Sequence, residues 1–202
     1  MRICRALPSI PALLVAAAFA VPAFGQQTQQ PGTTPPPASH PAPRPKPKPA
    51  VPTEAKPTLL GQYADWGAYT ASPAGKKICY AIAKPASAET KPPNRPRNQP
   101  YMFITTRPGD KVTNEVSIAV GYPFKPGFEA TAQVGSTSFA LYTQGDGAWI
   151  KNTAEESQMV QAMRQGDTAV IKGESSRGTQ TTDTYNLKGL SEALDRVAQE
   201  CH

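Results

Sequence analysis

"EVSIAVGYPFKPGFEATAQVGSTSFALYTQGDGAWIK", residues 115–151, is the stretch that sets the fold class. Apolar and polar residues alternate in 115–120 and again in 129–134, which is the period of two that half-buried β-strands show. Glycines in "VGST" (134–137) and "QGDGA" (144–148) suit tight hairpins, whose backbone angles glycine adopts without strain. Short strands joined by tight turns predict an antiparallel sheet that forms a sandwich or a barrel.

Short apolar or β-branched runs continue on both sides of this stretch. Gly, Pro, Asn and Asp separate the runs, as expected of the connections between strands. Strands are predicted at residues 62–70, 77–83, 101–106, 115–120, 129–134, 137–143, 148–151, 168–174 and 179–187. Residues 59–202 are therefore predicted to form one mainly β domain, which is long enough to have its own core.

Helical spacing replaces the strand pattern in two places. In 153–166, Thr153 is followed three residues later by Glu156, which predicts a capping box, and Gly166 suits the end of that helix. The second helix is predicted at 190–201. Its apolar residues recur at i, i+3, i+4, i+7 and i+11, at Leu190, Ala193, Leu194, Val197 and Cys201. Cys201 is thus expected on the buried side of a C-terminal helix.

The N-terminal residues 1–25 have the organisation of a secretory signal peptide. Arg2 and Arg5 precede a short apolar run at 12–21, and the small residues Ala23 and Gly25 suit the −3 and −1 positions of a cleavage site. The apolar run is about half the ~20 residues that a membrane-spanning helix needs. An exported chain, periplasmic or secreted, is expected, with no transmembrane segment after cleavage; the alternative is a segment retained as an anchor.

Proline dominates residues 26–58, where no aromatic residue occurs. Such a composition predicts a disordered linker with polyproline II character. The net charge of +6 includes Arg2 and Arg5 of the signal peptide and an excess of three positive charges in the linker. The domain is left at +1, which argues against nucleic acid as a partner. The basic "RPKPKP" (44–49) is interpreted as a spacer, or as a weak contact with anionic envelope polymers.

Histidine is too scarce to support the common catalytic mechanisms. The two histidines are His40, in the linker, and His202, the last residue. Ser-His-Asp and Cys-His mechanisms lack their base, and no phosphate-binding loop, dinucleotide fingerprint or EF-hand loop occurs. No catalytic residue, metal ligand or cofactor is predicted. One enzymatic alternative is a glycan hydrolase that uses two of the carboxylates Glu115, Glu174 and Asp183.

Seven residues in two segments are candidates for contact with a partner. The first segment, "GYPFKPGF" (121–128), places aromatic residues in a connection broken by Pro and Gly, where they can anchor a partner or pack against the end of the sheet. The second, 174–189, is the most polar part of the domain, and its charged residues suit structural hydrogen bonds or a ligand contact. The candidates are Tyr122, Phe124, Lys125, Phe128, Arg177, Asp183 and Tyr185.

Several segments, in order, resemble the invasion-associated locus B (IalB) family. They are "DWGAYT", "KICYAIAKP", "NEVSIAVGYPFKPG", the run from "AWIKNTAEESQ" to "LKGLSEAL", and the terminal Cys201. The resemblance covers residues 59–202 and none of the proline-rich segment. It implies an immunoglobulin-like antiparallel β-sandwich in the periplasm or at the cell surface, and a loose association with host-cell invasion. The family has no established catalytic residues to transfer, which implies an envelope protein that acts by contact or in envelope homeostasis.

Two cysteines, Cys79 and Cys201, remain once the signal peptide is removed. An even pair in an exported chain favours a disulfide. In the strand "ICYAIA" (78–83), Cys79 lies on the face of small residues, which a closely docked helix requires. The prediction is that the C-terminal helix packs on this strand and that a Cys79–Cys201 bond locks it there. The alternative is a reactive thiol or metal ligand at Cys79, activated by Lys76 and Lys77.

Overall fold

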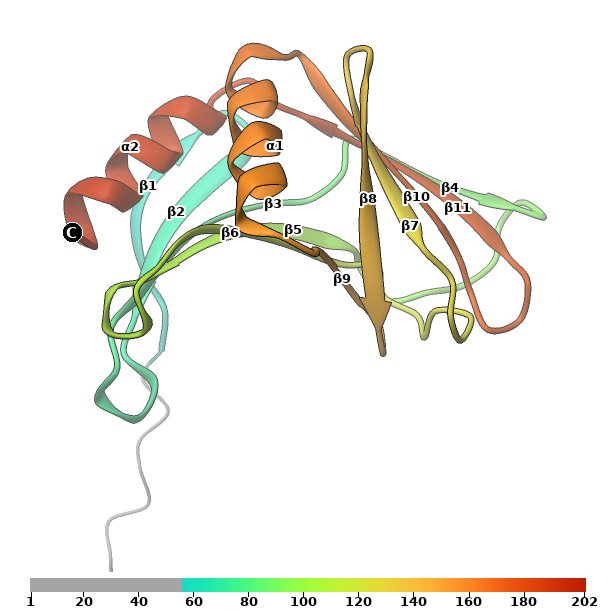
Figure 1. The fold of residues 1–202 in the computed structure, drawn as a ribbon, viewed down its shortest axis with the longest axis horizontal. Helices are drawn as coiled ribbons and strands as arrows, with labels where there is room; N and C mark the ends of the chain where they lie inside the picture. The colour runs from blue at the N-terminus through green and yellow to red at the C-terminus, as the bar shows by residue number, and fades with distance from the viewer. Residues whose placement is uncertain (1–55) are drawn as a thin grey trace, which may run out of the picture. The chain divides into compact units, whose positions relative to one another are not determined.

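The computed structural model describes residues 56–202, so the predicted signal peptide (1–25) and the linker up to residue 55 lie outside the described residues. Eleven strands form one antiparallel sheet, accompanied by two α-helices (Figure 1). The strands are β1 (Thr58–Tyr63), β2 (Trp66–Ala71), β3 (Ile78–Ala83), β4 (Ser87–Lys91), β5 (Tyr101–Arg107), β6 (Val112–Ala119), β7 (Ala130–Val134), β8 (Thr137–Gln144), β9 (Gly147–Ile150), β10 (Thr168–Glu174) and β11 (Gln180–Asn186). The helices are α1 (Thr153–Gln165) and α2 (Leu190–Glu200).

The order of strands in the sheet is β1-β2-β3-β5-β6-β9-β8-β7-β10-β11-β4. Most neighbours are joined by short turns, but β4 follows β3 in sequence and pairs with β11 at the opposite edge. The Ala86 amide donates to the Thr184 carbonyl at 2.7 Å, and Trp66 Nε1 donates to the Asn186 carbonyl at 2.9 Å. The sheet is therefore curled (Figure 1), and the start of β2 meets the end of β11 although these strands lie far apart in strand order.

The structure confirms a mainly β antiparallel fold with two helices, of which the C-terminal one packs on the sheet. It differs from an immunoglobulin-like sandwich because the ladder is continuous and does not divide into two sheets. The pairs Ser117↔Trp149 (β6 and β9) and Tyr142↔Trp149 (β8 and β9) carry hydrogen bonding from one half to the other. Because the sheet is curled, both halves still contribute to one core.

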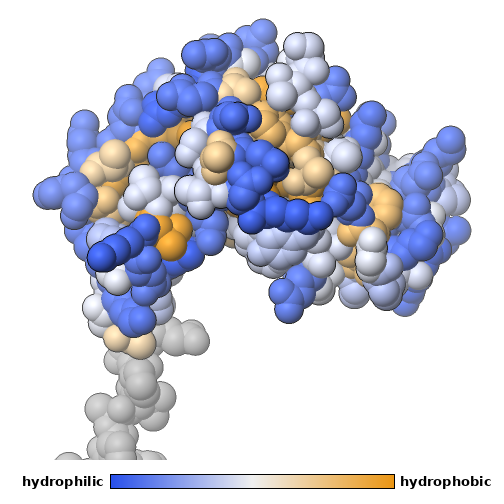
Figure 2. Space-filling model, in the orientation of Figure 1, coloured by the Kyte–Doolittle hydropathy of each residue, from blue (hydrophilic) through white to orange (hydrophobic). Residues whose placement is uncertain are grey.

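The two helices cover the inner face of the curled sheet. Helix α2 packs on β1, β2 and β3, and its apolar residues Leu190, Ala193, Leu194 and Val197 are buried. Helix α1 packs mainly on β6, through buried Met159, Val160 and Met163. Figure 2 shows hydrophobic residues gathered around these helices, with hydrophilic residues over most of the remaining surface in that view. Neither helix, nor any other within residues 56–202, has the length and apolar character needed to cross a membrane.

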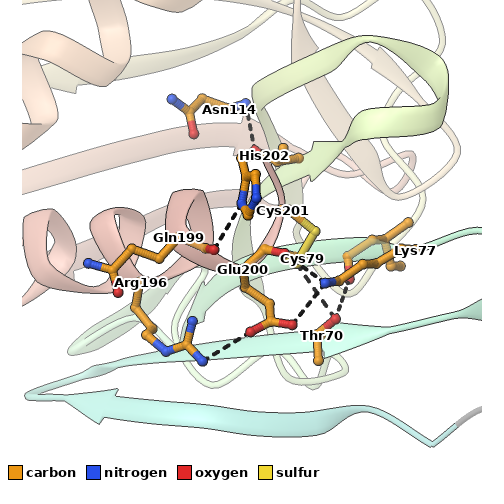
Figure 3. The surroundings of a disulfide bond; sticks show 11 residues. Thr70, Lys77, Cys79, Asn114, Arg196, Gln199, Glu200, Cys201 and His202 are labelled. Atoms are coloured by element: carbon orange, nitrogen blue, oxygen red, sulfur yellow. Dashed lines mark hydrogen bonds and ion pairs between the residues drawn. A yellow bond between two sulfur atoms is a disulfide. The ribbon is translucent and has the colours of Figure 1, made fainter.

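The predicted disulfide is present between Cys79 of β3 and Cys201, directly after α2 (Figure 3). Their Cα atoms lie 5.9 Å apart, within the range that a disulfide requires. Cys79, Ala81 and Ala83 are the buried residues of β3, so the small face predicted from sequence is the face that α2 covers. The sulfur of Cys79 is therefore part of a structural disulfide and is not a free thiol.

Lys77, next to this cross-link, is bonded to the end of α2. Its Nζ donates to the Glu200 carbonyl at 2.7 Å and to the Glu200 carboxylate at 2.8 Å (Figure 3). Arg196 donates to the same carboxylate at 3.1 Å. These two cations lower the pKa of Glu200. A cation that bonds the last carbonyls of a helix stabilises that helix end, so Lys77 supports α2 and has no thiol to activate.

The start of α1 differs from the predicted capping box by one residue. Asn152 is the N-cap, because its side chain accepts a hydrogen bond from the Glu155 amide at 2.8 Å. The Glu156 carboxylate instead accepts from the Val116 amide at 2.7 Å and ties the helix to β6. Burial is the main cause that raises the pKa of Glu156, and the bond from Val116 opposes that shift.

Glu156→Gln is expected to stabilise the domain slightly at neutral pH, by less than about 1 kcal/mol. Glutamine keeps an acceptor for the Val116 amide and removes a partly buried charge. A carboxyl with a raised folded-state pKa contributes stability below its unfolded pKa and loses that contribution as pH rises through the folded pKa. The variant should therefore be more stable than the wild type above about pH 4.5 and equally stable below it. Urea unfolding of both proteins at several pH values measures this difference. A variant that is less stable than the wild type at pH 7 would contradict this.

Candidate functional site: a cleft between three loops

One hollow on the described surface is a groove on the outer face of the sheet. It has a volume of about 690 Å³ and is lined in part by Tyr69, Tyr80 and Tyr101, with Asp65 and Lys84 at its sides. Tyr69 and Tyr80 stack on each other, with ring centroids 5.6 Å apart and an angle of 13° between the planes. Cross-strand aromatic pairs of this kind stabilise a sheet, which accounts for these rings without a ligand.

A second hollow, with a volume of about 630 Å³, lies where three loops meet. The first loop follows β4 (residues 92–98), the second follows β6 (121–123), and the third is the β10–β11 hairpin (175–179). We call this hollow the three-loop cleft. It gathers segments that are far apart in sequence, which is how a fold commonly builds a binding site.

Arg97, which lines the cleft, forms an ion pair with Asp183. Arg97 Nη1 donates to Asp183 Oδ2 at 2.8 Å and Nη2 donates to Oδ1, so the pair is bidentate. The side chains are only 8% and 1% exposed. Burial raises the pKa of Asp183 and the bonds from Arg97 oppose this shift, while the bond to Asp183 raises the pKa of Arg97. Arg97 also donates to the Val120 carbonyl at 3.2 Å, and so fastens the first loop to β11 and to the end of β6.

Tyr122 forms part of the cleft wall and is held on three sides. Its hydroxyl shares a 2.6 Å hydrogen bond with Thr181 Oγ1, and the Arg97 guanidinium lies 5.9 Å from its ring centroid. The ring of Phe124 meets it edge-on, with centroids 5.4 Å apart. Burial raises the pKa of the Tyr122 hydroxyl, which therefore stays protonated. This tyrosine is therefore a fixed, partly exposed aromatic surface of the cleft.

Gly121 allows the first and second loops to touch. Its φ is +79°, and a Cβ at this position would lie 2.2 Å from the Asn98 carbonyl oxygen. The close approach lets the Asn98 amide donate to the Gly121 carbonyl at 3.0 Å. A larger residue here would strain the backbone and separate the loops.

The third loop is folded around Ser175. The Ser175 hydroxyl oxygen accepts from the amides of Arg177, at 3.3 Å, and Thr179, at 3.1 Å. The Ser176 amide donates to the Pro123 carbonyl at 2.9 Å, which joins this loop to the second. All three loops are thus hydrogen-bonded to one another or to the strands beneath, and the cleft is preformed.

Within residues 56–202, no acidic side chain balances the positive charge of Arg95 and Arg177 at the cleft. Within residues 56–202, the guanidinium groups of Arg95 and Arg177 take part in no ion pair and no hydrogen bond, and both residues are exposed. No Asp or Glu is among the described residues that line the cleft. Arg97 is neutralised by Asp183, so the net charge of the lining comes from Arg95 and Arg177.

The structure brings together some of the residues that the sequence proposed as partner contacts. Tyr122 and Arg177 line the cleft, and Asp183 is the ion-pair partner of Arg97, which also lines it. Lys125 forms a 2.8 Å ion pair with Glu174 and is more than half exposed.

The remaining three candidates belong to the core or its border. Phe124 is buried and stacks on the half-buried Phe128, with centroids 6.4 Å apart, so these rings pack against the end of the sheet. Tyr185 is fully buried, and its hydroxyl has no hydrogen-bond partner within residues 56–202.

Sequence reasoning missed Arg95, Arg97 and Asn98. They occur in "PPNRPRNQP" (92–100), a proline-broken segment without apolar periodicity that carried no strand or helix signal. Two arginines separated by a single proline were the available signal, but sequence alone does not show that Arg97 meets Asp183, 86 residues away.

Each of the three carboxylates considered for a glycan hydrolase is bonded to a cation. Glu115 accepts two bonds from Arg107, at 2.7 and 3.0 Å; Glu174 pairs with Lys125; and Asp183 pairs with Arg97. Neither hollow is lined by any of the three. The part of the chain that the structure describes also holds no cluster of three metal-ligating side chains.

Comparison with known proteins gives one family. The family model described as "Invasion associated locus B (IalB) protein" matches residues 66–198, a span that includes all three loops of the cleft and Cys79. No curated protein and no solved structure matches the chain. Because the match covers more than half of the 202 residues, the chain belongs to the IalB family.

Proposed function

We propose that this protein is an exported, non-enzymatic protein of the cell envelope that binds a protein or envelope partner through the three-loop cleft. The observation that carries the proposal is the cleft itself, a preformed hollow of about 630 Å³ lined by Tyr122 and Arg177. The family description names an invasion-associated locus and no catalytic activity, which supports binding as the function.

The proposed location is the periplasm or the exterior of the cell. The Cys79–Cys201 disulfide supports this because such bonds persist in oxidising compartments. The predicted signal peptide in residues 1–25 supplies the route of export.

The residues at the cleft suit contact better than catalysis. The Ser175 hydroxyl oxygen already accepts two backbone hydrogen bonds, and Tyr122 shares its hydroxyl with Thr181. An activated nucleophile needs a neighbouring base, and the described lining residues include no His, Asp or Glu. What the cleft offers is a set of fixed donors and one aromatic ring, which is typical of a recognition site.

Ser176→Trp tests whether the cleft is the contact site. Ser176 is exposed and lines the cleft, so a tryptophan there should fill it without disturbing the core. The matched control is Ser136→Trp, which places the same side chain on the exposed turn between β7 and β8. Affinity of the mature chain for isolated cell envelopes, measured by sedimentation, should fall at least about tenfold in Ser176→Trp and stay unchanged in Ser136→Trp.

Equal affinity of both tryptophan variants and the wild type would rule out the cleft as the contact site. Sedimentation with purified peptidoglycan tests the alternative function as a wall-associated homeostasis module, which rests on the basic motif "RPKPKP". If that motif makes the contact, deletion of residues 31–57 should abolish sedimentation with peptidoglycan while Ser176→Trp has no effect. Release of reducing sugars from peptidoglycan by the wild-type chain would instead support the glycan hydrolase.

A further inference from the structure

We infer that the three-loop cleft binds an anionic group, a carboxylate or phosphate carried by its partner, through Arg95 and Arg177. This inference rests on the proposed function, because it names the chemistry that the cleft recognises. Neither arginine was singled out as an anion ligand by the sequence pattern, and only Arg177 was a candidate contact.

The main support for this inference is which arginines have an acidic partner and which do not. Six arginines lie in the described part of the chain, and four of them form ion pairs: Arg97 with Asp183, Arg107 with Glu115, Arg164 with Asp195 and Arg196 with Glu200. The two without an acidic partner in this part of the chain, Arg95 and Arg177, both line the same cleft. The arginines of residues 56–202 that have no acidic partner in that range thus lie at one place.

The local charge differs from that of the domain as a whole. Residues 59–202 have a net charge of only +1, while the cleft has two uncompensated positive charges and no acidic lining residue among those described. A concave surface of one sign concentrates the field and attracts ligands of the opposite sign. The charge of the domain is therefore distributed in a way that favours an anion at the cleft.

Guanidinium chemistry defines the ligand class. Arginine presents planar, rigidly arranged N–H donors that match the two oxygens of a carboxylate or phosphate. Ser176 and Asn98 also line the cleft, and within residues 56–202 their side chains form no hydrogen bond, so they can add neutral donors. A volume of about 630 Å³ has room for more than a single ion, which suits an anionic group on a larger chain.

The backbone at both arginines is fixed before a ligand arrives. The Arg95 amide donates to Thr90 Oγ1 at 3.0 Å, and the Arg177 amide donates to Ser175 Oγ at 3.3 Å. The buried Arg97–Asp183 pair holds the loop that carries Arg95. Only the side chains must be ordered on binding, which keeps the entropic cost low.

The test measures the affinity of the mature chain for polyglutamate, polyphosphate and uncharged dextran of similar length. The wild type should bind polyglutamate or polyphosphate and not dextran, and the preferred anion identifies carboxylate or phosphate as the group recognised. Affinity should fall at least about tenfold in Arg95→Gln/Arg177→Gln and be partly retained in Arg95→Lys/Arg177→Lys.

The matched control is Lys172→Gln/Lys188→Gln, which removes the same charge from two exposed lysines that do not line the cleft. It should change the affinity less than twofold. An equal loss in both double variants would show a general charge effect and overturn the inference, as would a wild type that binds neither polyanion. Equal thermal unfolding midpoints for all variants exclude a folding defect.

Different results would contradict the cleft as the contact site and the anionic group as its ligand. If Ser176→Trp abolishes envelope binding and Arg95→Gln/Arg177→Gln does not, the cleft is the contact site but the anionic ligand is wrong. If neither variant changes envelope binding, both proposals are wrong. Loss of binding in both, with the two controls unchanged, supports both.

Discussion

Replacing both Cys79 and Cys201 by alanine is expected to lower the free energy of unfolding by about 4–5 kcal/mol. The two cysteines are 122 residues apart in sequence, so their bond removes much of the conformational freedom of the unfolded chain. Alanine introduces no buried polar group at the fully buried Cys79. Urea unfolding of the oxidised wild type and the double variant measures the difference.

The reduced wild type is the control for this prediction. Reduction breaks the cross-link and keeps both side chains, so its free energy of unfolding should lie close to that of the double variant. Each single variant should lose nearly the whole amount, because either one removes the bond. A reduced protein as stable as the oxidised one would show that packing of α2 on β3 suffices without the bond.

Asp183→Ala is expected to destabilise the domain by about 3–5 kcal/mol, because it leaves the Arg97 charge buried without a partner. The cost arises mainly from desolvation of that charge. Replacing both partners, as Arg97→Met/Asp183→Leu, should cost much less, because well-packed apolar side chains can substitute for a buried ion pair. Denaturant unfolding of Arg97→Met, Asp183→Leu and the double variant measures this coupling.

The comparison among these variants separates the charge effect from simple loss of contacts. If the double variant loses the sum of the two single losses, the pair contributes no coupling and the prediction is contradicted. Asp195→Ala is a suitable control, since it removes the partner of Arg164 from an exposed ion pair. That variant should lose less than about 1 kcal/mol.

The periodicity of the sequence was sufficient to place most strands. The strand predicted at 168–174 has the bounds observed for β10, and those predicted at 101–106 and 137–143 each fall one residue short of the observed end. These strands have a buried inner face and an accessible outer face, which is the condition for alternation. Helix α2 was predictable for the same reason, since its inner side is apolar at helical spacing.

The elements that sequence did not predict lack such a pattern. Strand β4, "SAETK", has four exposed residues of five and pairs only with β11, so no apolar periodicity marks it. The single strand predicted at 62–70 is in fact two, β1 and β2, with a turn in which Ala64 has a φ of 47°. Alanine is uncommon at positive φ, so the usual turn residues were missing there.

The cleft was only partly predictable because it depends on the curl of the sheet. Tyr122 and Arg177 were singled out from unusual local composition, and both line it. Arg95 was missed because its role follows from the position of β4 beside β11, which is a property of strand order and not of local sequence. Asp183 was singled out, but its partner Arg97 lies 86 residues earlier in the chain.

The location of α2 has a consequence for the order in which the chain folds. Strands β1 to β3 are synthesised first, and the helix that covers their inner face is synthesised last. Until residues 190–201 are complete, the small apolar face of β3 stays uncovered and the Cys79 thiol has no partner. Contacts between the two ends of a sequence form slowly, because a long loop must close first. We therefore expect the first three strands to reach their final stability only after residues 190–201 have been made.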